Sequence, residues 1–174
     1  LWLRATYYHS RVLDYIESTT IAFNEDTGAR DTENRNKAEV EINGVETELE
    51  YRIGPGLSTF LNYTYNLSRI EEDDENPDRE GNYLAGLPRH KFRAGITYQN
   101  PAIINVSVLL RHDRHIYTND LNTEKAPDST TLDISLWRRF FDLATLRFTI
   151  ENSTDETEYI EDGRIYYGSM QFDF

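Results

Sequence analysis

Residues 166–174, YYGSMQFDF, show the alternation that decides the fold. Apolar or small side chains occupy every second position, and polar ones mostly fill the positions between them: Tyr166, Gly168, Met170, Phe172 and Phe174 alternate with Tyr167, Ser169, Gln171 and Asp173. Successive side chains of an extended chain point to opposite faces. This period of two therefore predicts a β-strand with one apolar and one polar face.

The same period recurs along the chain, and it predicts about eight strands with no convincing helix. The other strands are expected at residues 1 to about 16, with a possible continuation towards residue 23, and at 40–53, 61–67, 92–98, 104–110, 131–136 and 145–151. Within 40–53 the apolar positions change parity between Ile42 and Val45, and we interpret the intervening Asn43-Gly44 as a β-bulge.

The connections between these segments alternate strictly between short and long. Short ones are expected at 54–56, 100–101 and 141–142, and long polar ones at about 22–37, 70–89, 115–130 and 152–163. Such alternation is typical of an up-and-down meander with all its long loops at one end. Acidic side chains are concentrated in the long loops: residues 71–80, EEDDENPDRE, hold seven acidic side chains and one basic one.

The side chains opposite the apolar stripe are Glu, Arg, Asn, Ser, Thr and Lys. A soluble barrel would enclose an apolar interior, whereas a membrane barrel turns its apolar face to lipid and its polar face inward. Backbone groups in lipid must all be paired, so such strands close a ring. We expect an all-β, antiparallel, up-and-down transmembrane β-barrel; a soluble β-sandwich with one wet face is the alternative.

Charge and composition exclude several other classes. The 174 residues contain 31 Asp and Glu against 18 Lys and Arg, a net charge of −13, which argues against a nucleic-acid partner. There is no cysteine, so disulfides and thiolate metal sites are excluded. No nucleophile with its base, and no phosphate-binding loop, is present, so we do not expect an enzyme.

Five stretches, in order along the chain, resemble landmarks of one known family. They are YYHSRVLDYI (7–16), NGVE (43–46), NYTY (62–65), LPRHK (87–91) and the set Asn152, Tyr159 and Gly163-Arg164. Together they resemble the C-terminal part of the β-barrel of TonB-dependent outer-membrane receptors. Ser153-Thr154 departs from the pattern, because the family usually has a hydrophobic residue there, followed by a short acidic stretch.

The resemblance implies a larger barrel of about 22 strands filled by a plug. Residues 1–174 would then be one barrel segment without a plug or energy-coupling box. It implies energy-coupled uptake, across the bacterial outer membrane, of a bulky scarce nutrient of the siderophore, cobalamin, haem or glycan class. The implied partners are outer-membrane lipid, the barrel-assembly machinery, the TonB complex through parts not present, and an unidentified small ligand.

Two other interpretations stay open. A small standalone eight-stranded barrel could serve as a structural anchor or a surface-binding protein, since eight strands can close alone. An outer-membrane lipase or protease would share the barrel pattern, but the sequence offers no catalytic constellation for it. The sequence names neither the ligand nor the oligomeric state.

Three groups of residues are candidates for specific roles. By resemblance, Phe174 and Phe172 would form the signal read by the barrel-assembly machinery. The acidic loop offers carboxylates for Ca²⁺ or for a cationic ligand, although it lacks the EF-hand spacing and is also explained as a solvated loop: Glu71, Asp73, Asp74 and Asp78.

His115 and Tyr117, with His112 before them, could face a ligand, because such side chains can ligate haem iron or a metal chelate. The alternative is an aromatic girdle at the membrane surface. On the polar face we expect acidic side chains to pair with arginines: Glu46, Glu48 and Glu50 with Arg52, Arg93 and Arg147.

Overall fold

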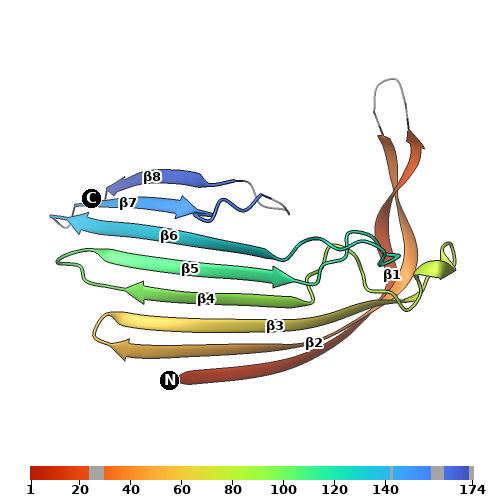
Figure 1. Ribbon diagram of the computed structural model, residues 1–174, viewed down its shortest axis with the longest axis horizontal. Helices are drawn as coiled ribbons and strands as arrows, with labels where there is room; N and C mark the ends of the chain where they lie inside the picture. Colours follow the sequence, from red (N-terminus) through yellow and green to blue (C-terminus); the bar gives the residue numbers. More distant parts are fainter. Residues whose placement is uncertain (24–29, 142, 158–162, 173–174) are drawn as a thin grey trace.

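Eight antiparallel strands form one sheet in the order β1 to β8, which confirms the predicted up-and-down meander (Figure 1). The structure, a computed structural model, describes residues 1–23, 30–141, 143–157 and 163–172. The strands are β1 (Trp2–Phe23), β2 (Arg30–Gly54), β3 (Leu57–Glu72), β4 (His90–Tyr98), β5 (Asn105–Arg114), β6 (Ser129–Phe140), β7 (Ala144–Glu151) and β8 (Ile165–Phe172). A 3₁₀ turn, η1 (Pro77–Arg79), interrupts the loop after β3.

The sheet is open in the part of the chain that the structure describes. Each strand pairs only with its neighbours in sequence, so β1 pairs with β2 alone and β8 with β7 alone. The described residues contain no helix of the length and apolarity that a membrane crossing needs.

The register gives the sheet two chemically opposite faces. One row of directly paired residues runs across six strands on what we call the outward face: Leu3, Leu49, Leu61, Ala94, Leu110 and Leu132. The next row, one residue along each strand, lies on the inner face: Arg4, Glu48, Asn62, Arg93, Arg111 and Thr131. The one-residue offset separates a hydrocarbon surface from a charged one, as the period of two predicted.

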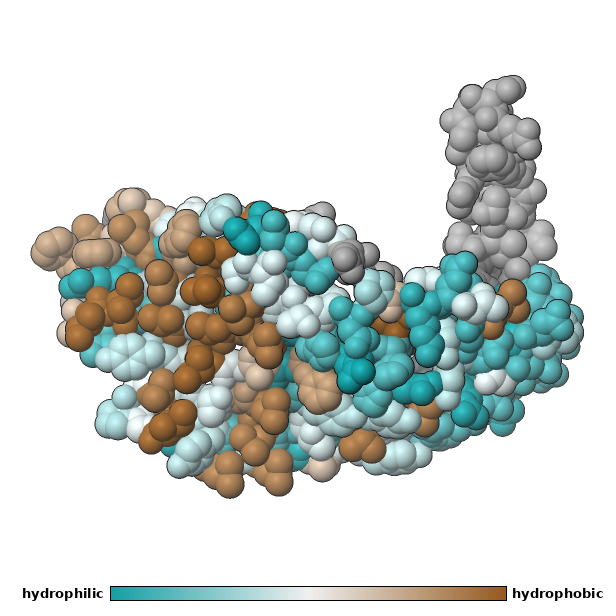
Figure 2. All heavy atoms as spheres, viewed as in Figure 1, coloured by the Kyte–Doolittle hydropathy of each residue, from teal (hydrophilic) through white to brown (hydrophobic). Residues whose placement is uncertain are grey.

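The outward face is uncovered: Leu3 is 68% exposed and Phe148 44% exposed. Figure 2 shows hydrophobic side chains gathered over the strands and hydrophilic ones over the loops beside the β1–β2 hairpin. β4 has nine residues and β5 has ten, close to the roughly 9–11 residues of a tilted strand that crosses a bilayer. Exposed apolar area of this extent indicates a lipid-facing surface.

The predicted bulge at Asn43-Gly44 is wrong. The β1–β2 register runs without a shift from Val45, opposite Tyr7, to Ile42, opposite Ser10. The register shifts that lie nearest to Gly44 are between Val12 and Tyr15 on β1 and between Glu39 and Val40 on β2.

The parity change has a different cause, which is that the surroundings of the inner face change along β2. Val40 and its partner Ile70 are fully buried and form a small core with Ala38 and Leu84. Leu84 comes from the loop after β3, which is bonded back along that strand: the Leu84 N–H donates to the Ser68 carbonyl (3.0 Å). Between this core and the β2–β3 turn, the inner face is polar. At Val40 and Ile70 a side chain from the loop packs on the same face, so the apolar side chains there point inward.

Gly44 is required by an aromatic ring rather than by a bulge. A Cβ atom on Gly44 would collide with the ring of Tyr8, its direct partner on β1. Gly95 lies in the same way under the ring of Phe60, its direct partner on β3. In both pairs an inward-facing ring covers the bare backbone of the opposite strand.

Candidate functional site

Ion pairs join neighbouring strands across the inner face. Arg4 of β1 donates to Glu48 of β2 (2.6 Å), and Arg111 of β5 lies 2.9 Å from the Asp133 carboxylate of β6. Arg93 makes two bonds to the Asp113 carboxylate, 2.7 and 3.0 Å long, in the two-pronged geometry that suits a guanidinium. The result is a charged wall held in register by its own pairs.

These pairs correct the expected partners. Glu48 pairs with Arg4, and Arg93 pairs with Asp113. Arg147 lies over the ring of Trp137, 4.9 Å from its centroid, instead of facing an acidic residue of β2. Each partner comes from the adjacent strand, because only directly or diagonally opposite side chains are within reach.

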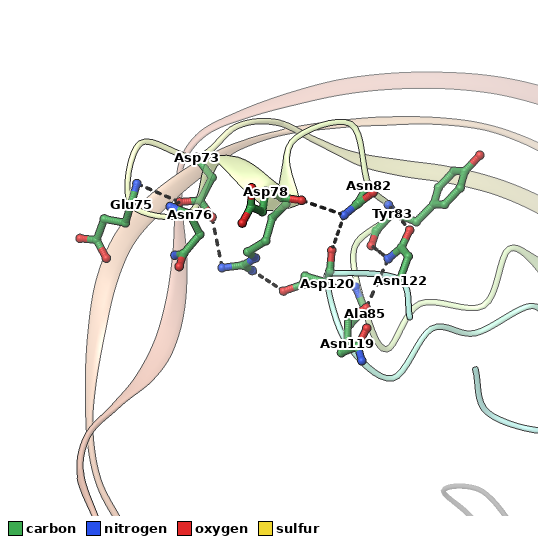
Figure 3. A network of polar contacts seen from close by, with 11 residues as sticks. Asp73, Glu75, Asn76, Asp78, Asn82, Tyr83, Ala85, Asn119, Asp120 and Asn122 are labelled. Atoms are coloured by element: carbon green, nitrogen blue, oxygen red, sulfur yellow. Dashed lines mark hydrogen bonds and ion pairs between the residues drawn. The ribbon is translucent and has the colours of Figure 1, made fainter. Parts of the chain in front are cut away.

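Above the strands, two long loops are bound into one structure (Figure 3). Arg79, in the loop after β3, makes an ion pair with Asp73 of the same loop (3.1 Å) and another with Asp120 of the loop after β5. Asp120 also accepts hydrogen bonds from the Ala85 N–H (2.6 Å) through its side chain and from the Asn82 amide (3.1 Å) through its carbonyl. The loops are therefore a continuous surface and not two independent flaps.

Asn122 strengthens this connection by bonding to the backbone of the other loop as a neighbouring strand would, through one donor and one acceptor. Its side-chain amide donates to the Tyr83 carbonyl and accepts from the Tyr83 N–H, both at 2.7 Å. Asn122 has a positive φ of 55°, a conformation that Asn tolerates better than most residues.

The acidic candidates do not converge. Asp73 is fully buried, and its carboxylate accepts from the backbone N–H groups of Glu75 (3.2 Å) and Asn76 (3.0 Å), so it organises the loop from within. Glu71, Asp74 and Asp78 are exposed. Among the residues that the structure describes, no group of three or more His, Asp or Glu side chains is placed to hold a metal ion.

His115 and Tyr117 belong to an aromatic cluster on the outer side of the loops. The His115 ring lies 5.4 Å from that of His90, and the Tyr117 ring stacks on Tyr83 at 5.9 Å with an angle of 6°. Tyr83 in turn contacts Arg69, whose Nη2 donates to the Tyr83 hydroxyl (3.3 Å). The β2–β3 register has no shift between Ser58 and Arg69. The side chain of Arg69 therefore lies on the same outward face as that of Leu61.

The same cluster contains residues that sequence reasoning missed, namely Arg69, Tyr83, Arg89 and Lys125. The hydrogen bond from Arg69 lowers the pKa of the Tyr83 hydroxyl, because the cation favours the charged tyrosinate; Arg89 acts in the same direction, against a smaller opposing effect of burial. For Arg69 the sequence did hold a signal, which is the alternation along β3: Arg69 follows Tyr65 by two outward positions.

The two aromatic candidates at the end of the chain are only partly described. Phe172 lies in β8 opposite Ala144, on the outward face, and is 52% exposed. Phe174 lies outside the described residues. The assembly role of Phe172 and Phe174 stays a prediction.

Comparisons with known proteins place this sheet among receptor barrels. A family model described as TonB dependent receptor-like, beta-barrel, matches residues 1–153. The chain superimposes on BauA, the ferric preacinetobactin receptor of Acinetobacter baumannii, with a TM-score of 0.73 at 16% identity, covering 99% of this chain and 27% of that one.

Two further solved structures give the same picture. The ferric yersiniabactin uptake receptor FyuA of Yersinia pestis has a TM-score of 0.70 at 15% identity, covering 99% of this chain and 27% of that one. The copper transporter OprC has a TM-score of 0.72 at 18% identity, with coverage of 99% and 29%. The chain thus spans little more than a quarter of these structures, and no curated protein matched it.

Proposed function

The chain belongs to the TonB-dependent receptor β-barrel family, and from this membership we propose that it supplies wall and extracellular loops to an energy-coupled nutrient receptor. Barrels of this family are outer-membrane proteins. The described strands provide an apolar face for lipid and a charged inner face, and the long loops lie together at one end. The observation that carries the proposal is this pair of opposed faces in the fold of known receptors.

We propose a metal chelate, such as a ferric siderophore, as the ligand class. Structures with this fold include receptors named for ferric preacinetobactin and ferric yersiniabactin and a copper transporter. The exposed carboxylates of Glu71, Asp74 and Asp78 make the loop end negative, which favours cationic or neutral chelates over anions. Cobalamin, haem and glycans are the other classes to be compared. The TonB complex would engage parts of the receptor outside this chain.

Uptake by cells tests the proposal directly. Cells that express the full-length protein as their sole receptor of this type are supplied with radiolabelled ferric siderophores, copper chelate, haem, cobalamin or oligosaccharide. We expect one metal chelate to accumulate, and its accumulation to stop when the TonB complex is deleted. Accumulation that persists without TonB would contradict energy coupling. Selective uptake of a glycan would overturn the ligand class while leaving receptor function intact.

A further inference from the structure

A basic and aromatic patch lies on the outward face directly beyond the lipid-facing surface. We define this outer patch as Arg69, Tyr83, Arg89, Tyr117 and Lys125. The outward row of β3 passes through Leu61, Tyr63 and Tyr65 before it reaches Arg69. The ring of Tyr65 contacts that of His90 at 5.3 Å, and this pair marks where the apolar surface ends and the patch begins.

Stacked rings hold the cations of the outer patch in place. Tyr83 and Tyr117 stack in parallel, and the Arg89 guanidinium lies 3.8 Å from the centroid of the Tyr83 ring. The Arg69 guanidinium lies 5.2 Å from the same centroid, and the Lys125 ammonium lies 5.1 Å from that of Tyr117. Cation–π contacts fix the side chains without neutralising their charge.

The outer patch is positive in a chain that is strongly negative overall. Among the described residues, no carboxylate lies within 4.0 Å of the charged groups of Arg69, Arg89 or Lys125. Two other cations of the outward face have acidic partners: Arg114 lies 2.7 Å from Asp128, and Arg11 pairs with Glu39. Arg138, near the end of β6, donates instead to the Ala102 carbonyl (3.1 Å). Three cations without an ion-pair partner among the described residues therefore gather at one height, in a molecule of net charge −13. The acidic side chain that acts on Arg69 is Glu71, two residues further along β3.

We propose that the outer patch binds the phosphate groups of lipid headgroups in the leaflet that surrounds the loops. It sits at the level where headgroups begin, because it follows the last lipid-facing aromatic residues of β3. Arginine presents several donors in the geometry that phosphate oxygens accept, and tyrosines are enriched at this depth of a membrane. Arg69 lies on the outward face of β3, away from the charged inner wall, and Tyr83 is bridged to it. Arg89 and Tyr117 contact the Tyr83 ring, so we place the patch outside the route proposed for the transported ligand.

Binding of a labelled lipid to the full-length protein in detergent tests the proposal. The probe is fluorescent lipid A that carries both of its phosphates. Replacing the three cations, Arg69→Gln, Arg89→Gln and Lys125→Gln, should weaken binding on the order of a hundredfold, since each cation near a headgroup contributes about fivefold. The charge-preserving pair Arg69→Lys with Arg89→Lys should retain most of the affinity. Arg11→Gln, which removes an already paired cation from the same face, should leave binding unchanged.

Three results would overturn the proposal. The first is undiminished lipid binding by the triple variant; if that variant also loses nutrient uptake, the patch belongs to the transported ligand. The second is equal affinity for the same lipid after its phosphates are removed. The third is full competition by inorganic phosphate, which would make this a site for the free anion. If the triple variant does not show the gel mobility of a folded barrel, the single variants, each weakened about fivefold, decide the matter.

Discussion

Gly44 and Tyr8 show how one side chain can fix the identity of another across a strand pair. The two residues are direct partners on β1 and β2, and the Tyr8 ring occupies the space that a Cβ on Gly44 would take. The carbonyl oxygen of Tyr65 on β3 crowds the same place. Glycine is therefore required here because a larger side chain would collide with these atoms, and not because of its backbone angles.

Gly44→Ala should destabilise the folded protein by about 1–3 kcal/mol, because the added methyl group forces the Tyr8 ring from its place. Urea titration of the full-length protein in detergent micelles measures the free energy of unfolding. Gly168→Ala is the matched control, since no atom lies within 4 Å of a Cβ built there. The cause is tested by making Gly44→Ala in a protein that already carries Tyr8→Ala. If Gly44→Ala destabilises that protein as much as it destabilises the original one, the ring is not responsible.

The strands themselves were predictable where one face is apolar. The eight strands appear at the expected places, and their alternation assigned the outward side chains of β3, β4 and β8. Residues 30–37, expected within a loop, belong instead to β2. Their sequence, RDTENRNK, has no apolar face and so gives no period of two, although the backbone pairs with β1 as far as Phe23 opposite Arg30.

Side-chain partners were less predictable, because they depend on register and on loops that fold back. Alternation places Glu48 and Arg93 on one face, but only the strand register pairs Glu48 with Arg4 and Arg93 with Asp113. The parity change near Gly44 is visible in the sequence, yet its cause is Leu84, forty residues away in a loop. No local pattern in the sequence predicts that contact.

The link between the two long loops should be weakened in Asp120→Ala. This change removes the ion pair with Arg79 and leaves the Ala85 N–H without its acceptor. We expect the free energy of local opening to fall by about 1–3 kcal/mol, seen as at least several-fold faster amide hydrogen exchange in residues 82–86. Asp74→Ala, an exposed acid of the same region, is the control. Unchanged protection in Asp120→Ala would mean that the bonds of Asn122 and the backbone hydrogen bond from the Gly86 N–H to the Tyr117 carbonyl hold the loops together without it.

For the whole molecule, the distribution of charge matters more than its total. Negative side chains gather on the exposed loop after β3, and paired charges line the inner face. The outer patch holds cations that have no ion-pair partner in the part of the chain that the structure describes. In the receptor that we propose, a ligand that approaches from outside would meet the negative loop first. Its field acts on the rate of association, and salt should screen it.

Neutralising the exposed acids should slow the capture of a cationic chelate. We expect Glu71→Gln, Asp74→Asn and Asp78→Asn together to lower the association rate constant about tenfold at low salt, with little change in the dissociation rate. Stopped-flow binding to the full-length protein at two salt concentrations measures both rates. Glu50→Gln, near the opposite end of β2, should have no effect. Faster capture by the triple variant would show that the natural ligand is an anion.

Within the described residues, each strand of the sheet pairs only with its neighbours in the sequence, so these eight strands can assemble without one segment being threaded past another. A single strand placed in lipid would leave its backbone N–H and C=O groups without partners, at a cost of several kcal/mol for each group. Two strands joined by a tight turn, such as β2 and β3 around Gly56, satisfy half of these groups before insertion and lose little chain entropy in doing so. The natural unit of insertion is therefore the hairpin, and the growing edge always offers the next hairpin a template.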